Sequence, residues 1–292
     1  MKIIVAIFLT SFIINSHAKI EIERSTNIKC KLPKTEKLVI GCTSRCGKFT
    51  TWGLRWHAKK LGYKLKIINL LSRNQTIDHT QVDGILIPGG DDIDPKWYIS
   101  KVTQEFANYL EGIKHWAKLT SGGAKRDTFE FGLLEEYFQN PKQKYQPILG
   151  ICRGMQVLTV SQGIPLYVDL KKEIGIKNRR YKIDTIKGTN PESLLHEIIG
   201  RKKFKGVELH HQALNLDYFA EHRSNWPHIE VTALSNKNNV AESLEFYKRP
   251  ILGVQFHPEY TFGRVRKNIF RWLLKRACFN KIMGSKLNRG SK

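Results

Sequence analysis

The chain has 292 residues, enough to bury the core of one large domain or two small ones, and 41% of them are hydrophobic. This composition excludes an intrinsically disordered chain and is that of a globular protein. The 49 Lys and Arg residues outnumber the 26 Asp and Glu residues, which gives a formal net charge of +23 spread over several clusters. Such a surface attracts anions, for example nucleic acid, an anionic cell envelope or an acidic small molecule; a basic solvated surface without a dedicated partner is the alternative.

The N-terminus has the pattern of an export signal. Lys2 precedes an apolar run over residues 3–14, and Ser16 and Ala18 are small residues at the positions that a signal peptidase reads. We expect residues 1–18 to be a cleaved signal peptide and the protein to be periplasmic or secreted. The run is shorter than the roughly 20 apolar residues of a transmembrane helix, although an uncleaved anchor is the alternative. No later stretch is long and apolar enough to span a membrane.

The first half of the chain alternates between predicted strands and helices. Residues 19–36 are polar and form an N-terminal extension, and the domain proper is expected over residues 37–278. Strands are predicted at residues 38–41, 65–70 and 82–87, with a helix at 50–61 that Gly62 ends. This order predicts right-handed crossovers and a mostly parallel sheet with helices on both faces.

The second half adds an antiparallel region to that sheet. Residues 97–127 are predicted to be an insertion with a break at Gly122-Gly123, followed by a helix that opens at residues 126–128 and ends by Pro141. Late strands are predicted at residues 229–233, 241–246 and 251–256, with a turn at 236–239. A last helix is predicted over residues 263–278, and residues 279–292 are expected to be a basic tail.

Cys152 stands at the centre of the functional prediction. The apolar strand at residues 148–151 ends at this cysteine, and a helix pattern begins at once with Arg153. A sharp strand-to-helix turn lifts a side chain clear of the sheet, and the N–H groups that open the helix stabilise a thiolate and a developing oxyanion. The alternative is a buried cysteine that only packs.

Two further patterns fit a thiol nucleophile. Gly89 and Gly90 follow the strand at residues 82–87 and let the backbone present N–H groups to a ligand, although a plain tight turn would look the same. His257 and Glu259 end the strand at residues 251–256, and alternate residues of an extended chain lie on the same side. His257 can therefore take the thiol proton while Glu259 orients its ring.

The remaining cysteines and histidines give no metal site. Cys30, Cys42, Cys46 and Cys278 are an even number, and the sequence does not choose among their three pairings. Cys42 and Cys46 lack the spacing of a zinc or redox Cys-x-x-Cys pair. The adjacent histidines at 210 and 211 point to opposite faces of a strand and are not expected to share a metal. The basic segment at residues 171–187 is either an anion-facing strip or a solvated face.

Five stretches carry a family resemblance: Leu86-Ile87-Pro88-Gly89-Gly90 with Asp92-Ile93-Asp94-Pro95, Arg126-Asp127 with Glu130, Leu149-Gly150-Ile151-Cys152-Arg153-Gly154-Met155-Gln156, His210-His211-Gln212-Ala213, and Gly253-Val254-Gln255-Phe256-His257-Pro258-Glu259. In this order and spacing the chain resembles the class I glutamine amidotransferase-like hydrolases of the peptidase C26 type. Within them it is most similar to the gamma-glutamyl-gamma-aminobutyrate hydrolase and gamma-glutamyl hydrolase group. The resemblance covers about residues 38–276 and implies a flavodoxin-like three-layer α/β sandwich.

The resemblance also implies roles for individual residues. Cys152 would attack the gamma-carbonyl of a gamma-glutamyl amide to form a thioester, with His257 and Glu259 completing the triad. The backbone N–H groups of Arg153 and of the Gly89-Gly90 loop would hold the oxyanion. The substrate-facing positions would be Gln156 and the strip formed by His210, His211 and Gln212, with Arg153 as a partner for a substrate carboxylate. No cofactor is implied, and the oligomeric state is left open, a homodimer included.

The chain departs from that family at two places near the pocket. Asp91 stands where the family usually has a third glycine, and Val207 and Glu208 stand where it commonly has Asn-Ser. Export is a third departure, because the polyamine-catabolic members resemble cytoplasmic enzymes, whereas exported gamma-glutamyl hydrolases act on polyanionic folylpolyglutamates. The alternatives are a glutaminase subunit that passes ammonia to a partner, and a binding protein that holds an anionic polymer on its basic face.

Overall fold

The computed structural model describes residues 28–72, 76–176, 181–235, 239–261 and 263–289. The predicted signal peptide, residues 19–27 of the predicted extension and most of the predicted turn at 236–239 lie outside the described residues. No helix in the described ranges has the length and apolar character needed to cross a membrane.

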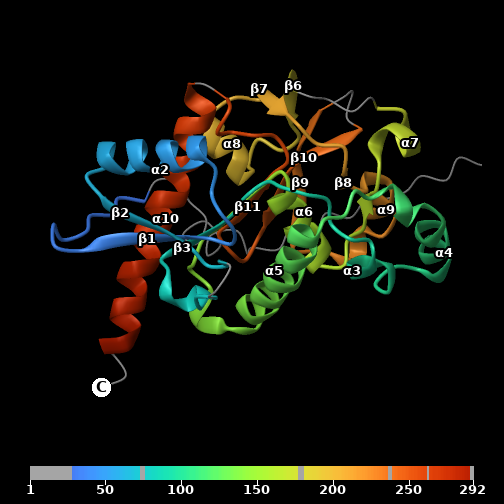
Figure 1. Ribbon diagram of the computed structural model, residues 1–292. Coiled ribbons are helices and arrows are strands. Elements are labelled where there is room, and N and C mark those ends of the chain that lie inside the picture. The colour runs from blue at the N-terminus through green and yellow to red at the C-terminus, as the bar shows by residue number, and fades with distance from the viewer. Residues whose placement is uncertain (1–27, 73–75, 177–180, 236–238, 262, 290–292) are drawn as a thin grey trace, which may run out of the picture.

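A nine-stranded sheet forms the middle of the molecule, as Figure 1 shows. Its strand order is β2-β1-β3-β4-β11-β10-β9-β6-β7. The pairs from β2 to β11 are parallel, and those from β11 to β7 are antiparallel. The predicted parallel sheet with an added antiparallel region is therefore confirmed. The strands are β1 (Lys37–Cys42), β2 (Lys64–Asn69), β3 (Gly84–Ile87), β4 (Ile148–Ile151), β6 (Lys182–Gly188), β7 (Lys203–Glu208), β9 (Ile229–Ser235), β10 (Val240–Phe246) and β11 (Ile251–Val254).

Helices cover both faces of the sheet. On one face α2 (Lys48–Lys60) and α8 (Leu194–Ile199) pack against the long C-terminal helix α10 (Arg264–Arg289), and on the other α5 (Ser121–Gln139) packs against α6 (Arg153–Ser161). Gly62, which follows α2, has a φ of 77°, as its predicted role as a helix stop requires. Shorter elements flank these layers: α3 (Lys96–Ile99), α4 (Gln104–Ile113), α7 (Leu170–Ile174), α9 (Leu216–Glu221), and the two-stranded sheet of β5 (Leu166–Tyr167) and β8 (Ala213–Leu214).

The central strands β3, β4 and β11 position the predicted site residues at one edge of the sheet. All of their residues are buried, because helices cover both faces. They run parallel, so their carboxyl ends lie along the same edge. The Gly89-Gly90 loop, Cys152 and His257 follow these three strands, and ligands of open α/β sheets bind at this edge.

The C-terminal helix is longer than predicted. It continues past Cys278 to Arg289, so the expectation of a tail from residue 279 is wrong for the described part. Asn280 Nδ2 donates to the Asp83 carbonyl at 3.1 Å, and Lys281 Nζ lies 3.3 Å from both Asp83 carboxylate oxygens. Ile282 packs against the core. These tertiary contacts stabilise residues 280–282 as part of the helix, although their composition alone predicts a solvent-exposed tail.

Helix α5 begins earlier than predicted. Its N-cap is Thr120, whose Oγ1 accepts from the Gly123 backbone N–H, so Gly122 and Gly123 lie in the first turn instead of forming a break. The cap satisfies one of the N–H groups that open the helix and makes glycine tolerable there. As a consequence Arg126, Asp127 and Glu130 share one rigid helix.

Two disulfides resolve the pairing that the sequence leaves open. Cys30 pairs with Cys278, and Cys42 pairs with Cys46. The first bond joins the N-terminal segment to α10, and the second closes the loop between β1 and α2. Cys152 is the one free cysteine in the described part of the chain.

Candidate active site

Cys152 occupies a strained turn between β4 and α6. Its φ is 52° and its ψ is −108°, a region that residues other than glycine rarely adopt. The Cys152 N–H donates to the Val254 carbonyl at 2.7 Å, which ties the turn to β11. The thiol therefore stands at the end of the sheet with the opening turn of α6 behind it, the arrangement of a nucleophile elbow.

The turn closes because glycines flank it. A methyl group on Gly154 would lie 2.0 Å from the Ile87 carbonyl oxygen, and one on Gly150 would lie 2.6 Å from the Gly154 carbonyl oxygen. Any larger side chain would push α6 away from β3 and β4. The Gly-x-Cys-x-Gly spacing is therefore a packing requirement of this turn.

His257 and Glu259 form the predicted pair. His257 Nδ1 lies 2.8 Å from Glu259 Oε1, and both side chains are about nine-tenths buried. Burial alone would lower the pKa of His257, but its hydrogen bonds to Cys152 and Glu259 and the charges of these groups outweigh it and raise the pKa to about 10. The imidazole therefore stays protonated at neutral pH.

The contacts of the histidine backbone and ring fix its position. Its N–H donates to the Val207 carbonyl at 2.8 Å, and its carbonyl accepts from Thr261 Oγ1 at 3.0 Å. The ring of Tyr260 lies 5.4 Å from the imidazole, centre to centre. The antiparallel strand β7 thus helps to position a group that follows the parallel strand β11.

Arg126 orients the Gly89-Gly90 loop. Its guanidinium donates to the carbonyls of Pro88 at 2.9 Å and Gly89 at 3.0 Å. In a trans peptide the N–H points away from the carbonyl, so the N–H groups of Gly89 and Gly90 point away from the guanidinium. A methyl group on Gly89 would lie 3.1 Å from His257 Cε1 and 3.6 Å from Cys152 Cβ, which places this loop beside both residues.

A family model matches the part of the chain that carries this site. The model of peptidase C26 matches residues 67–259, more than half of the chain. The chain belongs to the peptidase C26 family. This membership supports a hydrolase or amidotransferase that acts on a glutamine-type amide.

Related proteins support the family of this peptidase C26 protein, and a solved structure supports its fold. A glutamine amidotransferase-like protein of Rickettsia prowazekii is 26% identical over 276 residues, covering 77% of this chain and 92% of that protein. Protein NtpR of Enterococcus hirae is 28% identical over 190 residues, covering 62% of this chain and 68% of that protein. The glutaminase domain of Trypanosoma brucei CTPS with bound acivicin has a TM-score of 0.54 at 14% identity, covering 84% of this chain and 94% of that domain. This last likeness shows the flavodoxin-like fold.

The Arg153 side chain has a different position from the one expected of a substrate partner. Its guanidinium is 1% exposed and binds Asp127 Oδ1 at 2.5 Å and Glu130 Oε2. Glu130 also accepts from Thr43 at 2.6 Å and from Arg126 at 2.9 Å. In this peptidase C26 protein the guanidinium therefore links α6 to α5 by ion pairs. The Arg153 backbone N–H is at the first position of α6 and lacks an acceptor within the helix, so it can donate to a ligand.

The predicted substrate-facing glutamines lie in a buried polar chain that reaches the thiol. Gln156 Nε2 donates to the Gln212 carbonyl at 2.8 Å and lies 3.4 Å from Gln255 Oε1, and Gln255 Nε2 lies 3.6 Å from Cys152 Sγ. Gln212 Oε1 accepts from the Ile93 N–H at 3.1 Å. These glutamines join the elements around the thiol.

The two adjacent histidines contact different partners, although both follow β7 instead of lying on a strand as predicted. His211 Nε2 lies 2.8 Å from Asp92 Oδ1 and holds the loop that follows Gly90. His210 is buried, and its Nδ1 donates to the Gln212 carbonyl at 3.1 Å. Burial lowers the pKa of His210 to about 4, so the imidazole is neutral at neutral pH.

Three further residues of the family motifs, for which the sequence predicts no individual role, contribute to the site: Arg126, Glu130 and Gln255. The spacing of Arg126 and Glu130 places them one helical turn apart, which is the signal of an ion pair. Gln255 stands two residues before His257, in the bend that follows β11. Their contacts cross from one element to another, which spacing alone does not reveal.

Proposed function

We propose that this peptidase C26 protein is an exported cysteine hydrolase that cleaves gamma-glutamyl amide bonds. The observation that carries the proposal is the strained Cys152 turn with the 2.8 Å pair of His257 and Glu259 beside it. A packing cysteine needs neither the strain nor a protonated imidazole.

In the proposed reaction the Cys152 thiolate attacks the gamma-carbonyl carbon. The N–H groups of Arg153 and of the Gly89-Gly90 loop hold the oxygen that gains charge. His257 gives its proton to the leaving amine as the C–N bond breaks and a gamma-glutamyl thioester remains. Water then loses a proton to His257 and attacks the thioester, which releases glutamate and restores the thiolate.

The disulfides support the export part of the proposal. Cys30–Cys278 and Cys42–Cys46 are bonds that persist in oxidising compartments. They accompany the signal-like pattern of residues 1–18. Sequencing the N-terminus of the protein recovered from the cell envelope or medium tests this, and a chain that still begins at Met1 would contradict it.

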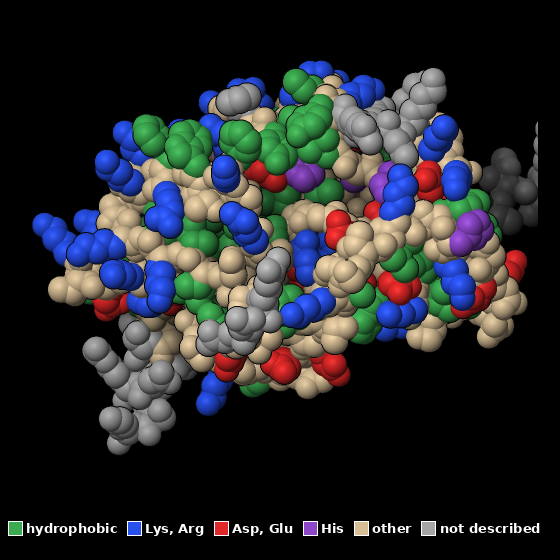
Figure 2. All heavy atoms as spheres, in the orientation of Figure 1, with side chains coloured by type: hydrophobic (Ala, Val, Ile, Leu, Met, Phe, Trp, Pro, Cys, Tyr) green, Lys and Arg blue, Asp and Glu red, His purple; other side chains and the backbone are tan. Residues whose placement is uncertain are grey.

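A basic groove beside the catalytic histidine supports an acidic leaving group. The groove has a volume of about 590 Å³ and lies between β6, β7 and the start of α10, with Tyr260 at its margin. Its floor is apolar, and its lining contains no Asp or Glu among the described residues. Four exposed cations surround it: Arg201, Lys203, Lys205 and Arg264. Figure 2 shows hydrophobic side chains along the upper edge of the molecule with Lys and Arg around them.

A panel of gamma-glutamyl compounds tests the activity and the groove together. We expect glutamate release from gamma-glutamyl amides, with a higher kcat/KM for gamma-glutamyl-glutamate than for a neutral gamma-glutamyl amide or a gamma-glutamyl polyamine. The double variant Lys203→Glu and Lys205→Glu should lower kcat/KM for the acidic substrate about tenfold and leave the neutral substrate unchanged, since exposed charge pairs contribute up to ~1 kcal/mol each.

Lys142→Glu is the matched control, because Lys142 is exposed in the short helix Pro141–Gln143, away from the groove. It should alter neither substrate's kinetics. An equal loss for acidic and neutral substrates would contradict the groove assignment while leaving the hydrolase intact. Release of ammonia from glutamine only when a partner protein is present would instead favour an amidotransferase subunit.

The alkaline limit of activity should depend on Glu259. Because the pKa of His257 is raised to about 10, its protonated form persists at neutral pH and is lost as the pH rises through about 10. Glu259→Gln removes one source of that increase, so the alkaline limb of the kcat/KM profile should move to lower pH and activity should fall about 10²–10⁴-fold. An unchanged limb in a steady-state pH profile would contradict this role.

A further inference from the structure

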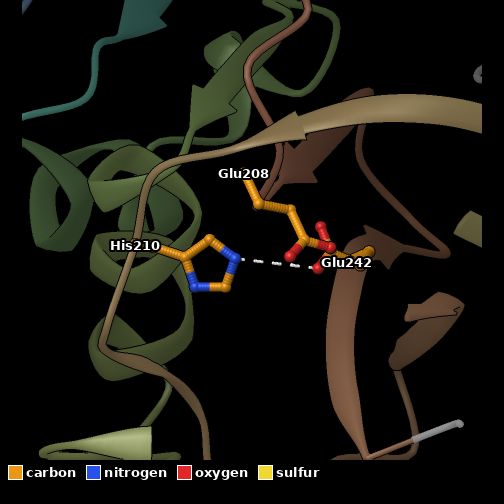
Figure 3. A group of neighbouring side chains, drawn as sticks. All are labelled: Glu208, His210 and Glu242. Carbon is orange, nitrogen blue, oxygen red and sulfur yellow. Dashed lines mark ion pairs between the residues drawn. The ribbon is translucent and has the colours of Figure 1, made fainter. Parts of the chain in front are cut away.

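Three buried side chains meet behind the catalytic residues, on the antiparallel part of the sheet. Glu208 ends β7, His210 follows it by two residues, and Glu242 lies on β10. All three are at least nine-tenths buried, and one ligand atom from each lies within 4.8 Å of the others. Figure 3 shows the imidazole and both carboxylate groups directed toward one another. Neither the proposed reaction nor the family resemblance uses this cluster as a unit.

The imidazole has a defined orientation in this cluster. A carbonyl oxygen only accepts hydrogen bonds, so the contact with the Gln212 carbonyl places the hydrogen of His210 on Nδ1. Nε2 then carries a lone pair directed at the carboxylates. It is buried and has no hydrogen-bond partner among the described residues, and Glu242 Oε1 lies 3.7 Å away. A lone pair that faces carboxylate oxygens is unfavourable unless a proton or a cation lies between them.

We propose that Glu208, His210 and Glu242 bind a divalent metal ion of the zinc class. Imidazole nitrogen with two carboxylates is a donor set that suits Zn²⁺ and neighbouring transition metals, whereas Ca²⁺ and Mg²⁺ favour oxygen alone. A hydrogen bond from the second ring nitrogen to a backbone carbonyl is the usual way in which a metal-binding histidine is oriented. Ser235 Oγ plays the same part for Glu242, since it donates to Oε1 at 2.7 Å.

The spacing suits a small ion after a modest contraction. Bonds of ~2.0–2.2 Å in a tetrahedral site place ligand atoms ~3.4 Å apart, and Nε2 and Oε1 are already at 3.7 Å. The main competitor is the ammonium group of a substrate, which would need an open path into a site whose carboxylates are 0 to 1% exposed. A metal ion needs only a transient opening.

Such an ion would brace the sheet where it supports the catalytic histidine. Strands β9 and β6 separate β10 from β7 in the sheet order, yet the cluster brings the end of β7 against β10. Val207, next to Glu208, accepts the hydrogen bond from the His257 N–H. The ion would therefore stabilise the position of His257 without touching the substrate.

Metal content and binding test the site directly. The experiment uses untagged full-length protein with Cys152→Ser, so that the catalytic thiol cannot be the ligand. After chelator treatment, calorimetry with Zn²⁺ should show one site per chain, and Zn²⁺ should raise Tm by several degrees at concentrations well above Kd. Co²⁺ should give d–d absorption without a sulfur charge-transfer band.

Variants connect that binding to the three residues. Glu208→Gln and Glu242→Gln should each weaken Zn²⁺ binding by about 100-fold or more. Glu230→Gln is the matched control, because Glu230 is a half-buried glutamate on β9 that accepts hydrogen bonds from Asn190 and Tyr247. Zn²⁺ binding by this variant should be unchanged. Glu208→Asp keeps a carboxylate, so it should retain weakened binding if the Gln variants do not fold. Folded Cys152→Ser protein that binds no Zn²⁺, or binding that survives in both Gln variants, would overturn the proposal.

Discussion

Replacing Cys152 by alanine is expected to abolish glutamate release from every gamma-glutamyl substrate, with kcat reduced by about 10⁴-fold or more. Cys152 is the one free cysteine in the described part of the chain, and water cannot form the thioester. His257→Ala should have an effect of the same order, because the leaving amine then lacks its proton donor. Retained turnover in either variant would contradict the mechanism.

Covalent trapping checks the same expectation independently. Cys152 is the one free cysteine among the described residues, so a glutamine-analogue electrophile should add one mass increment at this position. Cys152→Ala should take up no label. It should still unfold like the native protein, since the Val254 carbonyl and the flanking glycines hold the turn by its backbone.

Replacing Glu130 by glutamine is expected to cost about 3–5 kcal/mol of unfolding free energy, a large share of the ~5–15 kcal/mol typical of a domain. Glu130 is fully buried and binds the guanidinium groups of Arg126 and Arg153. The neutral amide would leave these two buried cations with only Asp127 as an anionic partner in the cluster. Denaturant unfolding measures the loss.

Glu136→Gln is the control for that loss. Glu136 lies on the same helix with a side chain that is 74% exposed, so its replacement should change stability by no more than about 0.5 kcal/mol. A loss of the same size in both variants would show that α5, not the buried charge cluster, limits stability.

The pH dependence should identify the carboxylate as the cause. Burial alone would raise the pKa of Glu130, but Arg153, Arg126 and Thr43 outweigh it and hold the pKa below its ordinary value. A lowered folded-state pKa contributes stability above the unfolded value, and this contribution is lost as the pH falls through the folded value. The difference in unfolding free energy between the native protein and the Glu130→Gln variant should therefore become smaller as the pH falls.

The elements nearest to Cys152 were predictable because their signals are local. A buried strand, a cysteine at its end and a helix pattern follow one another within residues 148–158, and sterics at Gly150 and Gly154 require that order. His257 and Glu259 do form the predicted pair, but the expected reason is wrong. Residues 258–260 form a turn instead of an extended chain, and the Tyr260 N–H donates to the His257 carbonyl at 3.2 Å.

The errors arose where distant residues decide the structure. Asp83 contacts the helix that was expected to end at Cys278, and Asp127 with Glu130 takes the guanidinium of Arg153 that a substrate was expected to bind. The cluster of Glu208 with Glu242, for which there was no expectation, likewise joins residues from strands that are not neighbours in the sheet. No periodicity in the sequence records such contacts.

The Cys30–Cys278 bond turns most of the chain into a covalent ring. A protease that cuts once anywhere between these two cysteines would open the ring without separating the pieces, so the nicked molecule would keep its mass on a non-reducing gel and fall into two fragments after reduction. The nucleophile and its histidine, which lie more than a hundred residues apart, would stay on one molecule even after a cut between them. A hydrolase built in this way would tolerate damage in an environment rich in proteases.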